Sequence, residues 1–185
     1  MVARNGGAPG VDGQTLGQIT ATPETRSHWL TGLEEEWKTK TYRPAPVRRV
    51  LIPKSNGGQR PLGLPRVKDR VVQMAARLVL GPIFEADFHP CSDGFRPGRN
   101  AHPAVDEIVK APRSGRLEVV EADLSKYFDT IPHDRLMKLV ARRTSDGSLL
   151  HLGRPWLDAP VVEERESRRQ VLPNRQGVPQ GGRSV

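Results

Sequence analysis

Two aspartates six residues apart, Asp123 and Asp129, have the type and spacing that best suit metal chemistry. Asp123 directly follows residues 117–122, a short stretch rich in β-branched residues that predicts a β-strand. A carboxylate at the end of a buried strand can hold Mg²⁺, which takes one or two protein carboxylates and completes its shell with water and phosphate oxygens. Two such ions can clamp the attacking and leaving oxygens of a phosphoryl transfer. A simpler alternative stays open, in which Asp123 caps a turn and Asp129 begins a helix.

Positive charge is concentrated in one part of the sequence. The 28 residues from Arg43 to Arg70 hold eight basic residues and one acidic residue, so they carry nearly all of the net charge of +8. Such a block predicts salt-sensitive contacts with the phosphates of a nucleic acid or nucleotide. Lys54 and Arg60 flank the turn signal at residues 55–58, where two cations could reach a triphosphate. The alternative is a solvated basic face.

A second segment, residues 91–100, combines one aromatic residue with two arginines. Phe95, Arg96 and Arg99 lie within five positions of one another, among glycine and proline residues that predict a loop. Interleaved aromatic and arginine side chains suit single-stranded nucleic acid, because bases stack on the rings and phosphates pair with the guanidinium groups.

The elements that must position these residues are helices and a few strands. Residues 47–53 and 59–64 predict an antiparallel hairpin. Helices are expected after an N-cap at Thr22, over residues 68–80 until Gly81 and Pro82 end the helix, after an N-cap at Asn100, and from an opening segment at residues 130–134. Gly153 and Pro155 argue against one straight helix near residues 149–157. The charged residues 163–176 are expected to be exposed.

Size and composition limit the class of protein. The 185 residues suit one domain, or parts of two that pack together. Cys91 is the single cysteine, so no disulfide within the chain is expected, which fits a reducing compartment. No apolar run approaches the roughly 20 residues that span a bilayer, and the first residues lack a hydrophobic signal region. We therefore predict a cytoplasmic protein with no membrane partner, and the oligomeric state stays open.

Five motifs, taken in order, resemble the reverse transcriptase domain of bacterial group II intron-encoded proteins. Gly10–Gly13 resembles the motif of the N-terminal extension, and residues 52–65 and 93–99 resemble the two fingers motifs. Residues 121–129 resemble the first palm motif, and residues 177–182 resemble the Pro-Gln-Gly motif that follows it. Each motif is weak alone, but five in the same order across almost the whole chain are specific.

The resemblance implies an α+β fold, with the fingers and a partial palm of a right-hand polymerase built from mixed helices and a short antiparallel sheet. It divides the chain into an N-terminal extension with fingers at residues 1–115 and a partial palm at residues 116–185. It implies RNA-directed DNA polymerase activity, which is nucleotidyl transfer from dNTPs with Mg²⁺ or Mn²⁺. The implied partners are an RNA template or intron RNA, a DNA primer and dNTPs.

The resemblance also implies roles for individual residues. Asp123 becomes the catalytic metal ligand, with the Leu124 carbonyl beside it, and Phe128 lies under the incoming sugar and excludes a 2′-hydroxyl. The other implied positions contact nucleotide or nucleic acid. They are Lys54 and Arg60 at the triphosphate, Pro179, Gln180 and Gly181 in the nucleotide pocket, and Arg48, Arg49, Arg96 and Arg99 on nucleic acid.

The sequence departs from the family pattern where a catalytic Asp-Asp hairpin is expected. No Asp-Asp pair occurs in the 185 residues. We therefore predict a catalytically incomplete chain, truncated before that hairpin by a frameshift or premature stop, and of marginal stability because a half-built palm exposes an apolar face. Two alternatives stay open: a non-catalytic, maturase-like RNA-binding fragment, and a degenerate remnant without function.

Overall fold

The structure is a computed structural model that describes residues 7–55, 57–165 and 168–178. Its contacts divide the chain into two compact units, one made of residues 1–77 and 126–185 and the other of residues 78–125. The described residues form helices and a four-stranded sheet, which confirms the α+β class. The predicted fingers and palm regions, meeting at residue 115, stay a prediction.

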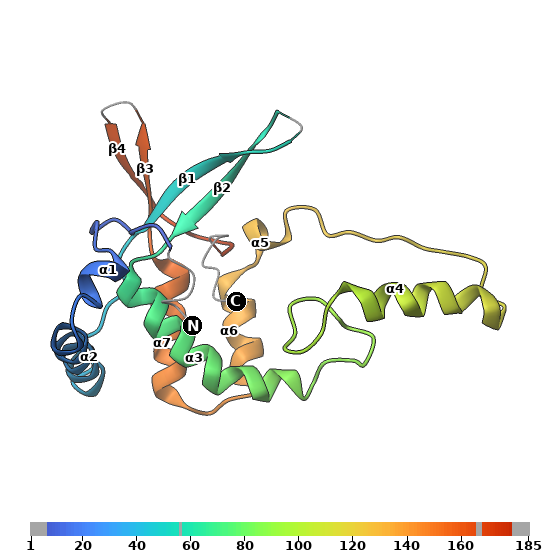
Figure 1. Ribbon diagram of the computed structural model, residues 1–185, viewed down its shortest axis with the longest axis horizontal. Coiled ribbons are helices and arrows are strands. Elements are labelled where there is room, and N and C mark those ends of the chain that lie inside the picture. Colours follow the sequence, from blue (N-terminus) through green and yellow to red (C-terminus); the bar gives the residue numbers. More distant parts are fainter. Residues whose placement is uncertain (1–6, 56, 166–167, 179–185) are drawn as a thin grey trace. The chain divides into compact units, whose positions relative to one another are not determined.

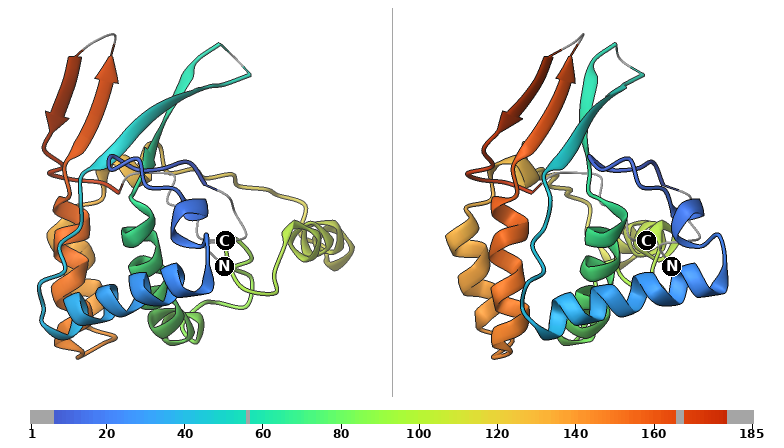
Figure 2. Two further views of the ribbon diagram at one scale, coloured as in Figure 1. Left: turned by 60° about the vertical axis from the view of Figure 1, so that its left-hand side comes forward. Right: turned by 90° about the vertical axis from the view of Figure 1, so that its left-hand side faces the viewer.

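The sheet of the first unit consists of two hairpins. Strands β1 (Val47–Pro53) and β2 (Gln59–Leu64) pair antiparallel, as do β3 (Val161–Arg165) and β4 (Arg168–Leu172). The predicted hairpin at residues 47–64 is confirmed. The strand order is β2-β1-β3-β4, and β1 and β3 run parallel over three residue pairs, from Val47 to Arg49 on β1. The sheet is therefore mixed, and the prediction of an antiparallel sheet was wrong at this junction. Beyond it the two hairpins diverge (Figures 1 and 2).

In the view of Figure 1, the helices of the first unit lie below its sheet. The Thr22 hydroxyl accepts a hydrogen bond from the Thr25 amide at the start of α2 (Pro23–Lys38), which confirms the predicted N-cap; a short helix, α1 (Leu16–Ile19), precedes it. Helix α3 spans Val67–Glu85 and α7 spans Gly147–Asp158. Helices α2, α3 and α7, together with residue 42, supply a core cluster of Leu33, Tyr42, Val72 and Leu152.

A buried polar network lies beside this core. Asp69 on α3 is 1% exposed. Its carboxylate accepts hydrogen bonds from the Tyr42 hydroxyl at 2.7 Å, the Ala45 amide at 3.1 Å and the Arg66 guanidinium at 3.1 and 3.2 Å. The Trp156 indole on α7 donates to the Tyr42 hydroxyl at 3.1 Å. The network therefore connects two helices and the segment that leads into β1. Burying the carboxylate is tolerated because it is paired and fully hydrogen-bonded.

We expect this network to make the chain sensitive to alkali. Burial, together with the neighbouring Asp69 charge, raises the pKa of Tyr42 well above its usual value near 10. The neutral phenol therefore stabilises the fold fully below about pH 10, and that contribution falls by about 1.4 kcal/mol per pH unit above it. Denaturant unfolding between about pH 8 and 12 should show this slope in the natural chain and a shallower slope in Tyr42→Phe. Parallel slopes would contradict it.

Two helices continue through prolines that were expected to end or break them. Helix α3 runs past Pro82 to Glu85, and α7 is a single helix that contains Gly153 and Pro155, so both predictions were wrong. A proline inside a helix removes one backbone hydrogen bond, here to the carbonyl of an exposed residue, Leu78 or His151, which water can reach. Gly153 has a packing role, because a Cβ there would lie only 3.0 Å from the Met137 side chain.

Met137 belongs to α6 (His133–Ala141), which begins within the opening segment predicted at residues 130–134 and packs against α7. The one-turn helix α5 (Tyr127–Thr130) precedes it. Both belong to the first unit.

The second unit contains the C-terminal part of α3, a loop, α4 (Ala101–Lys110) and the 3₁₀ turn η2 (Ala111–Ser114). The Asn100 side chain accepts from the His102 amide at 2.9 Å, which confirms the predicted N-cap of α4. The expected strand at residues 117–122 is not formed: this segment is irregular, and Leu117 and Val119 are 79% and 87% exposed (Figure 1). No described strand pairs with the segment, and a strand without a partner is not stable.

Across the residues that the structure describes, no helix is both long enough and apolar enough to span a membrane.

Candidate nucleotide and nucleic-acid interface

The tip of the β1–β2 hairpin carries the two cations predicted to bind a triphosphate. Arg60 lies opposite Ile52 in the ladder, and the Lys54 amide donates to the Gly58 carbonyl at 2.7 Å, which closes the turn. Both side chains are exposed. The turn has a left-handed residue at Gly57, with φ of +80°, which glycine adopts without strain. Hairpin geometry therefore brings two cations to one exposed end of the sheet.

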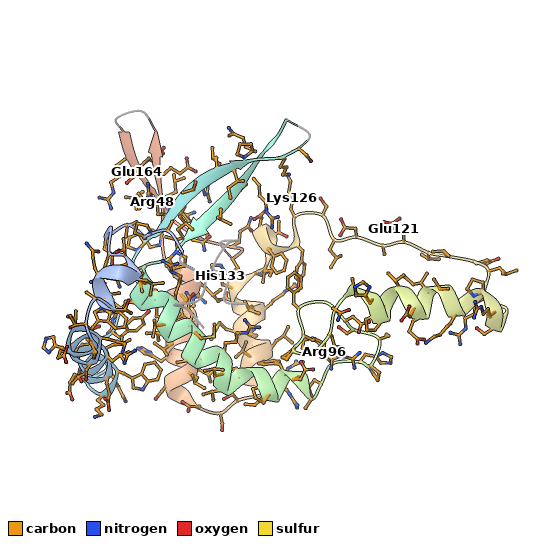
Figure 3. The ribbon with its side chains drawn as sticks, viewed as in Figure 1. Arg48, Arg96, Glu121, Lys126, His133 and Glu164 are labelled. Carbon is orange, nitrogen blue, oxygen red and sulfur yellow. The ribbon has the colours of Figure 1, made fainter. Side chains whose placement is uncertain are left out.

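The arginines at the base of the same hairpin lie beside carboxylates of β3. Arg49 donates to Glu163 at 2.7 Å, and Arg48 lies 3.4 Å from Glu164, a pair labelled in Figure 3. These contacts hold the parallel β1–β3 junction and compensate part of the positive charge there. The prediction that Arg48 and Arg49 contact nucleic acid is untested, and the structure gives both residues an additional role within the sheet.

In the second unit, two arginines organise the loop between α3 and α4. The Arg96 side chain, 8% exposed, pairs with Glu85 and donates to the carbonyls of His89 and Ser92. Arg99 donates to Asp93 at 3.0 Å and to the Pro90 carbonyl. Arg96 also lies over the Phe88 ring at 5.1 Å. Their predicted contact with nucleic acid stays a prediction, whereas their contacts within the loop are structural.

Asp123 and Leu124 lie in the exposed segment that precedes α5, and both belong to the second unit. Among the described residues, no three His, Cys, Asp or Glu side chains come together as a group that could hold a metal ion. The exposed Asp123 carboxylate is an oxygen ligand of the kind that Mg²⁺ prefers, so it fits one coordination position.

Phe128 lies on α5, with its ring edge-on to Tyr127 at 5.5 Å. The chain returns to this turn fifty residues later: the Val178 amide donates to the Phe128 carbonyl at 2.7 Å, and the Gly177 amide donates to the Ile131 carbonyl at 2.8 Å. Gly177 has φ of +77°, and a Cβ there would lie 2.5 Å from the Asp129 carbonyl oxygen. Pro179, Gln180 and Gly181, predicted to line the nucleotide pocket, lie outside the described residues.

The buried His133 completes this contact and was not recognised in the sequence. Its Nε2 lies 2.7 Å from the Gly177 carbonyl oxygen, and its Nδ1 lies 3.3 Å from Asp158 Oδ1. Burial opposes ionisation of Asp158, but hydrogen bonds from Arg154 and His133 outweigh it, so the pKa of Asp158 lies below its ordinary value. Arg154 also pairs with Asp134. The sequence signal for His133 was weak, because a single histidine at the start of a helix does not indicate that it contacts a residue 44 positions away.

A family model for reverse transcriptase (RNA-dependent DNA polymerase) matches residues 52–184. The Escherichia coli protein YkfC is 41% identical over 178 residues, which are 94% of this chain and 45% of YkfC. The group II intron-encoded protein LtrA of Lactococcus lactis is 36% identical over 146 residues, which are 78% of this chain and 24% of LtrA.

Nuclear intron maturase 1 of Arabidopsis thaliana is 34% identical over a shorter stretch of 88 residues, which are 48% of this chain and 12% of the maturase. The chain thus spans less than half the length of each of these relatives. The family model covers the end of β1, all of β2, the Asp123 segment, the Phe128 turn and His133, and extends over well more than half of the sequence. The chain belongs to the reverse transcriptase (RNA-dependent DNA polymerase) family.

Proposed function

We propose that this chain forms part of an RNA-directed DNA polymerase of the group II intron-encoded kind, which transfers nucleotides from dNTPs to a DNA primer on an RNA template. The observation that carries the proposal is the continuous family match over residues 52–184, in a chain 36% identical to an intron-encoded protein. The exposed Lys54 and Arg60 suit the triphosphate, because charged donors on a water-exposed tip can pair with phosphate oxygens on arrival.

The metal chemistry is assigned to Asp123. Its carboxylate, with the Leu124 carbonyl, would supply oxygen ligands to a divalent ion, Mg²⁺ or Mn²⁺, whose remaining positions take water and substrate phosphates. Held there, a divalent ion would supply electrostatic stabilisation of the oxygens that attack and leave in the transfer. Phe128 would lie against the sugar and exclude a 2′-hydroxyl by contact, while Pro179, Gln180 and Gly181 would line the pocket for the base pair.

Primer extension on an RNA template with Mg²⁺ and dNTPs tests the catalytic part of the proposal. We expect no extension by the 185-residue chain alone, because the two-metal reaction needs positioned carboxylates in addition to Asp123. The chain is to be compared with Asp123→Ala and with Asp106→Ala, which changes an exposed aspartate on α4. Extension that Asp123→Ala abolishes and Asp106→Ala preserves would show that other carboxylates of the chain complete the site, and would contradict the expectation.

RNA binding tests the basic hairpin separately from catalysis. Replacing Lys54 and Arg60 together by alanine should weaken binding to single-stranded RNA and lower the slope of log affinity against log salt by about 1.4, because each phosphate contact contributes about 0.7. The matched control replaces Arg135 and Lys138, two exposed cations on α6, so that the net charge changes equally. Fluorescence anisotropy from about 50 to 300 mM KCl gives both slopes. Equal slopes in the two variants would contradict a hairpin-specific contact.

A second candidate function is a non-catalytic, maturase-like RNA-binding role. It is favoured by the concentration of positive charge in residues 43–70 and by the similarity to an intron maturase. Salt-sensitive RNA binding that depends on Lys54 and Arg60, with no measurable binding of dATP or ATP, would support this role over the polymerase.

A further inference from the structure

Three separate segments meet at the Phe128 turn, and His133 is the side chain that contacts the other two. It lies at the start of α6, directly after the turn, and is 4% exposed. One ring nitrogen reaches the Gly177 carbonyl, and the other faces Asp158 at the end of α7. We use the name Gly177 latch for the Gly177 and Val178 amide bonds to the turn together with the bond from His133 to the Gly177 carbonyl.

Each bond of the latch has a defined direction. The Gly177 and Val178 amides donate to carbonyls of the turn. These two bonds do not use the Gly177 carbonyl, which accepts from another part of the chain. His133 Nε2 supplies the donor at 2.7 Å, in a buried position where an unpaired carbonyl would be unfavourable. Asn174, three residues before Gly177, donates to the Leu157 carbonyl at 2.7 Å and lies 3.5 Å from the Gly177 carbonyl oxygen, a longer and weaker contact than that of His133. The segment is therefore held on both sides, by the turn and by α6 and α7.

The latch leaves little freedom between Phe128 and Val178. The Val178 amide is bonded to the backbone of Phe128 itself, and the close approach of Gly177 to Asp129 admits no side chain. A movement of the 177–178 segment would therefore change the backbone position of the aromatic residue proposed to lie against the sugar.

We propose that His133 is a positioning residue for sugar recognition: through the Gly177 carbonyl it fixes the 177–178 segment against the turn that carries Phe128. The inference rests on the proposed polymerase function for the role of Phe128, but not for the latch itself. It assigns His133 a role that depends on the donor at Nε2, the closer of the two side-chain donors that reach the Gly177 carbonyl.

The chain offers a graded set of variants. In His133→Gln the amide nitrogen reaches about as far as Nε2 and can still donate to the Gly177 carbonyl, whereas the shorter His133→Asn cannot, and His133→Phe keeps a ring without a donor. His151→Gln, an exposed position on α7, is the matched control. Circular dichroism melts identify any variant that fails to fold. If His133→Asn or His133→Phe fails, the natural chain can still be compared with His133→Gln, the most conservative of the three.

Hydrogen exchange at the Val178 and Gly177 amides measures how well the latch protects these two amides, and it needs no nucleotide. We expect exchange to be at least about ten-fold faster in His133→Asn and His133→Phe, close to natural in His133→Gln and unchanged in His151→Gln. Amides of the β1–β2 ladder serve as the internal reference, since the latch does not contact them. Unchanged protection of Val178 in the Asn and Phe variants would overturn the inference.

Calorimetric titration with dATP and with ATP, each with Mg²⁺, separates positioning from a purely structural role. We expect the preference for dATP over ATP to fall about five-fold in His133→Phe and to return in His133→Gln. Faster exchange with an unchanged preference would overturn the link to sugar recognition. If the natural chain binds neither nucleotide, sugar recognition by Phe128 in this chain fails, and the exchange result alone decides whether the latch exists.

Discussion

Replacing Asp69 by alanine is expected to lower the free energy of unfolding by about 3–5 kcal/mol, the usual effect of removing one partner from a buried ion pair. The variant leaves the Tyr42 hydroxyl, the Ala45 amide and the Arg66 guanidinium without their shared acceptor. Stabilities of domains are of the order of 5–15 kcal/mol, so this one change should remove a large part of the total.

Urea unfolding followed by tryptophan fluorescence measures the loss directly, because Trp156 donates to Tyr42 within the network. Asp106→Ala is the control, since Asp106 is exposed on α4, and should change stability by less than about 0.5 kcal/mol. An Asp69→Ala chain as stable as the control would mean that water replaces the carboxylate, and would contradict the account of the network as buried.

The second large effect is expected at Gly177. In Gly177→Ala the new Cβ would lie 2.5 Å from the Asp129 carbonyl oxygen and 2.6 Å from its carbon, both backbone atoms that cannot move alone. The residue also has φ of +77°, which is unfavourable for alanine. Together these effects predict a loss of about 2–4 kcal/mol.

Gly13→Ala separates the two causes. Gly13 has a similar φ of +68°, but no atom lies within 4 Å of its ideal Cβ, so this variant should lose only the backbone part, about 1–2 kcal/mol. Chemical denaturation of both variants gives the difference, which is the free energy of the clash. Equal losses would show that the 177–178 segment moves away from the turn readily.

Local patterns predicted much of the first unit. The hairpin at residues 47–64 followed from strand-forming residues around a glycine-rich turn, and the caps at Thr22 and Asn100 followed from residue type. The β3–β4 hairpin was missed, because residues 163–170 are dominated by charge. Those charges are part of the sheet: Glu163 and Glu164 lie beside Arg49 and Arg48 of β1. The apolar pairs Val161–Val162 and Val171–Leu172, which flank the charges, were the available signal.

The candidate site was predicted only in part, for the same physical reason. Motifs named the family and the positions of Lys54, Arg60, Asp123 and Phe128, because these residues carry their chemistry in their side chains. The latch is made largely of backbone groups, Gly177 and Val178 on the Phe128 turn. Any residue type except proline can donate a backbone hydrogen bond to another segment, so such bonds are not visible in the sequence. The exception is Gly177, where the close approach requires glycine.

The parallel junction between β1 and β3 also determines the order in which this chain can fold. Each hairpin closes over a few residues, whereas the Arg49–Glu163 contact joins positions 114 residues apart. Contacts of long sequence separation form slowly, since the loop entropy is lost before the pairing gain is realised. During synthesis, the β1–β2 hairpin can form early. The edge of β1 that pairs with β3 then stays unpaired until β3 leaves the ribosome. The first unit is therefore exposed to wrong strand pairing while the residues between β1 and β3 are being made.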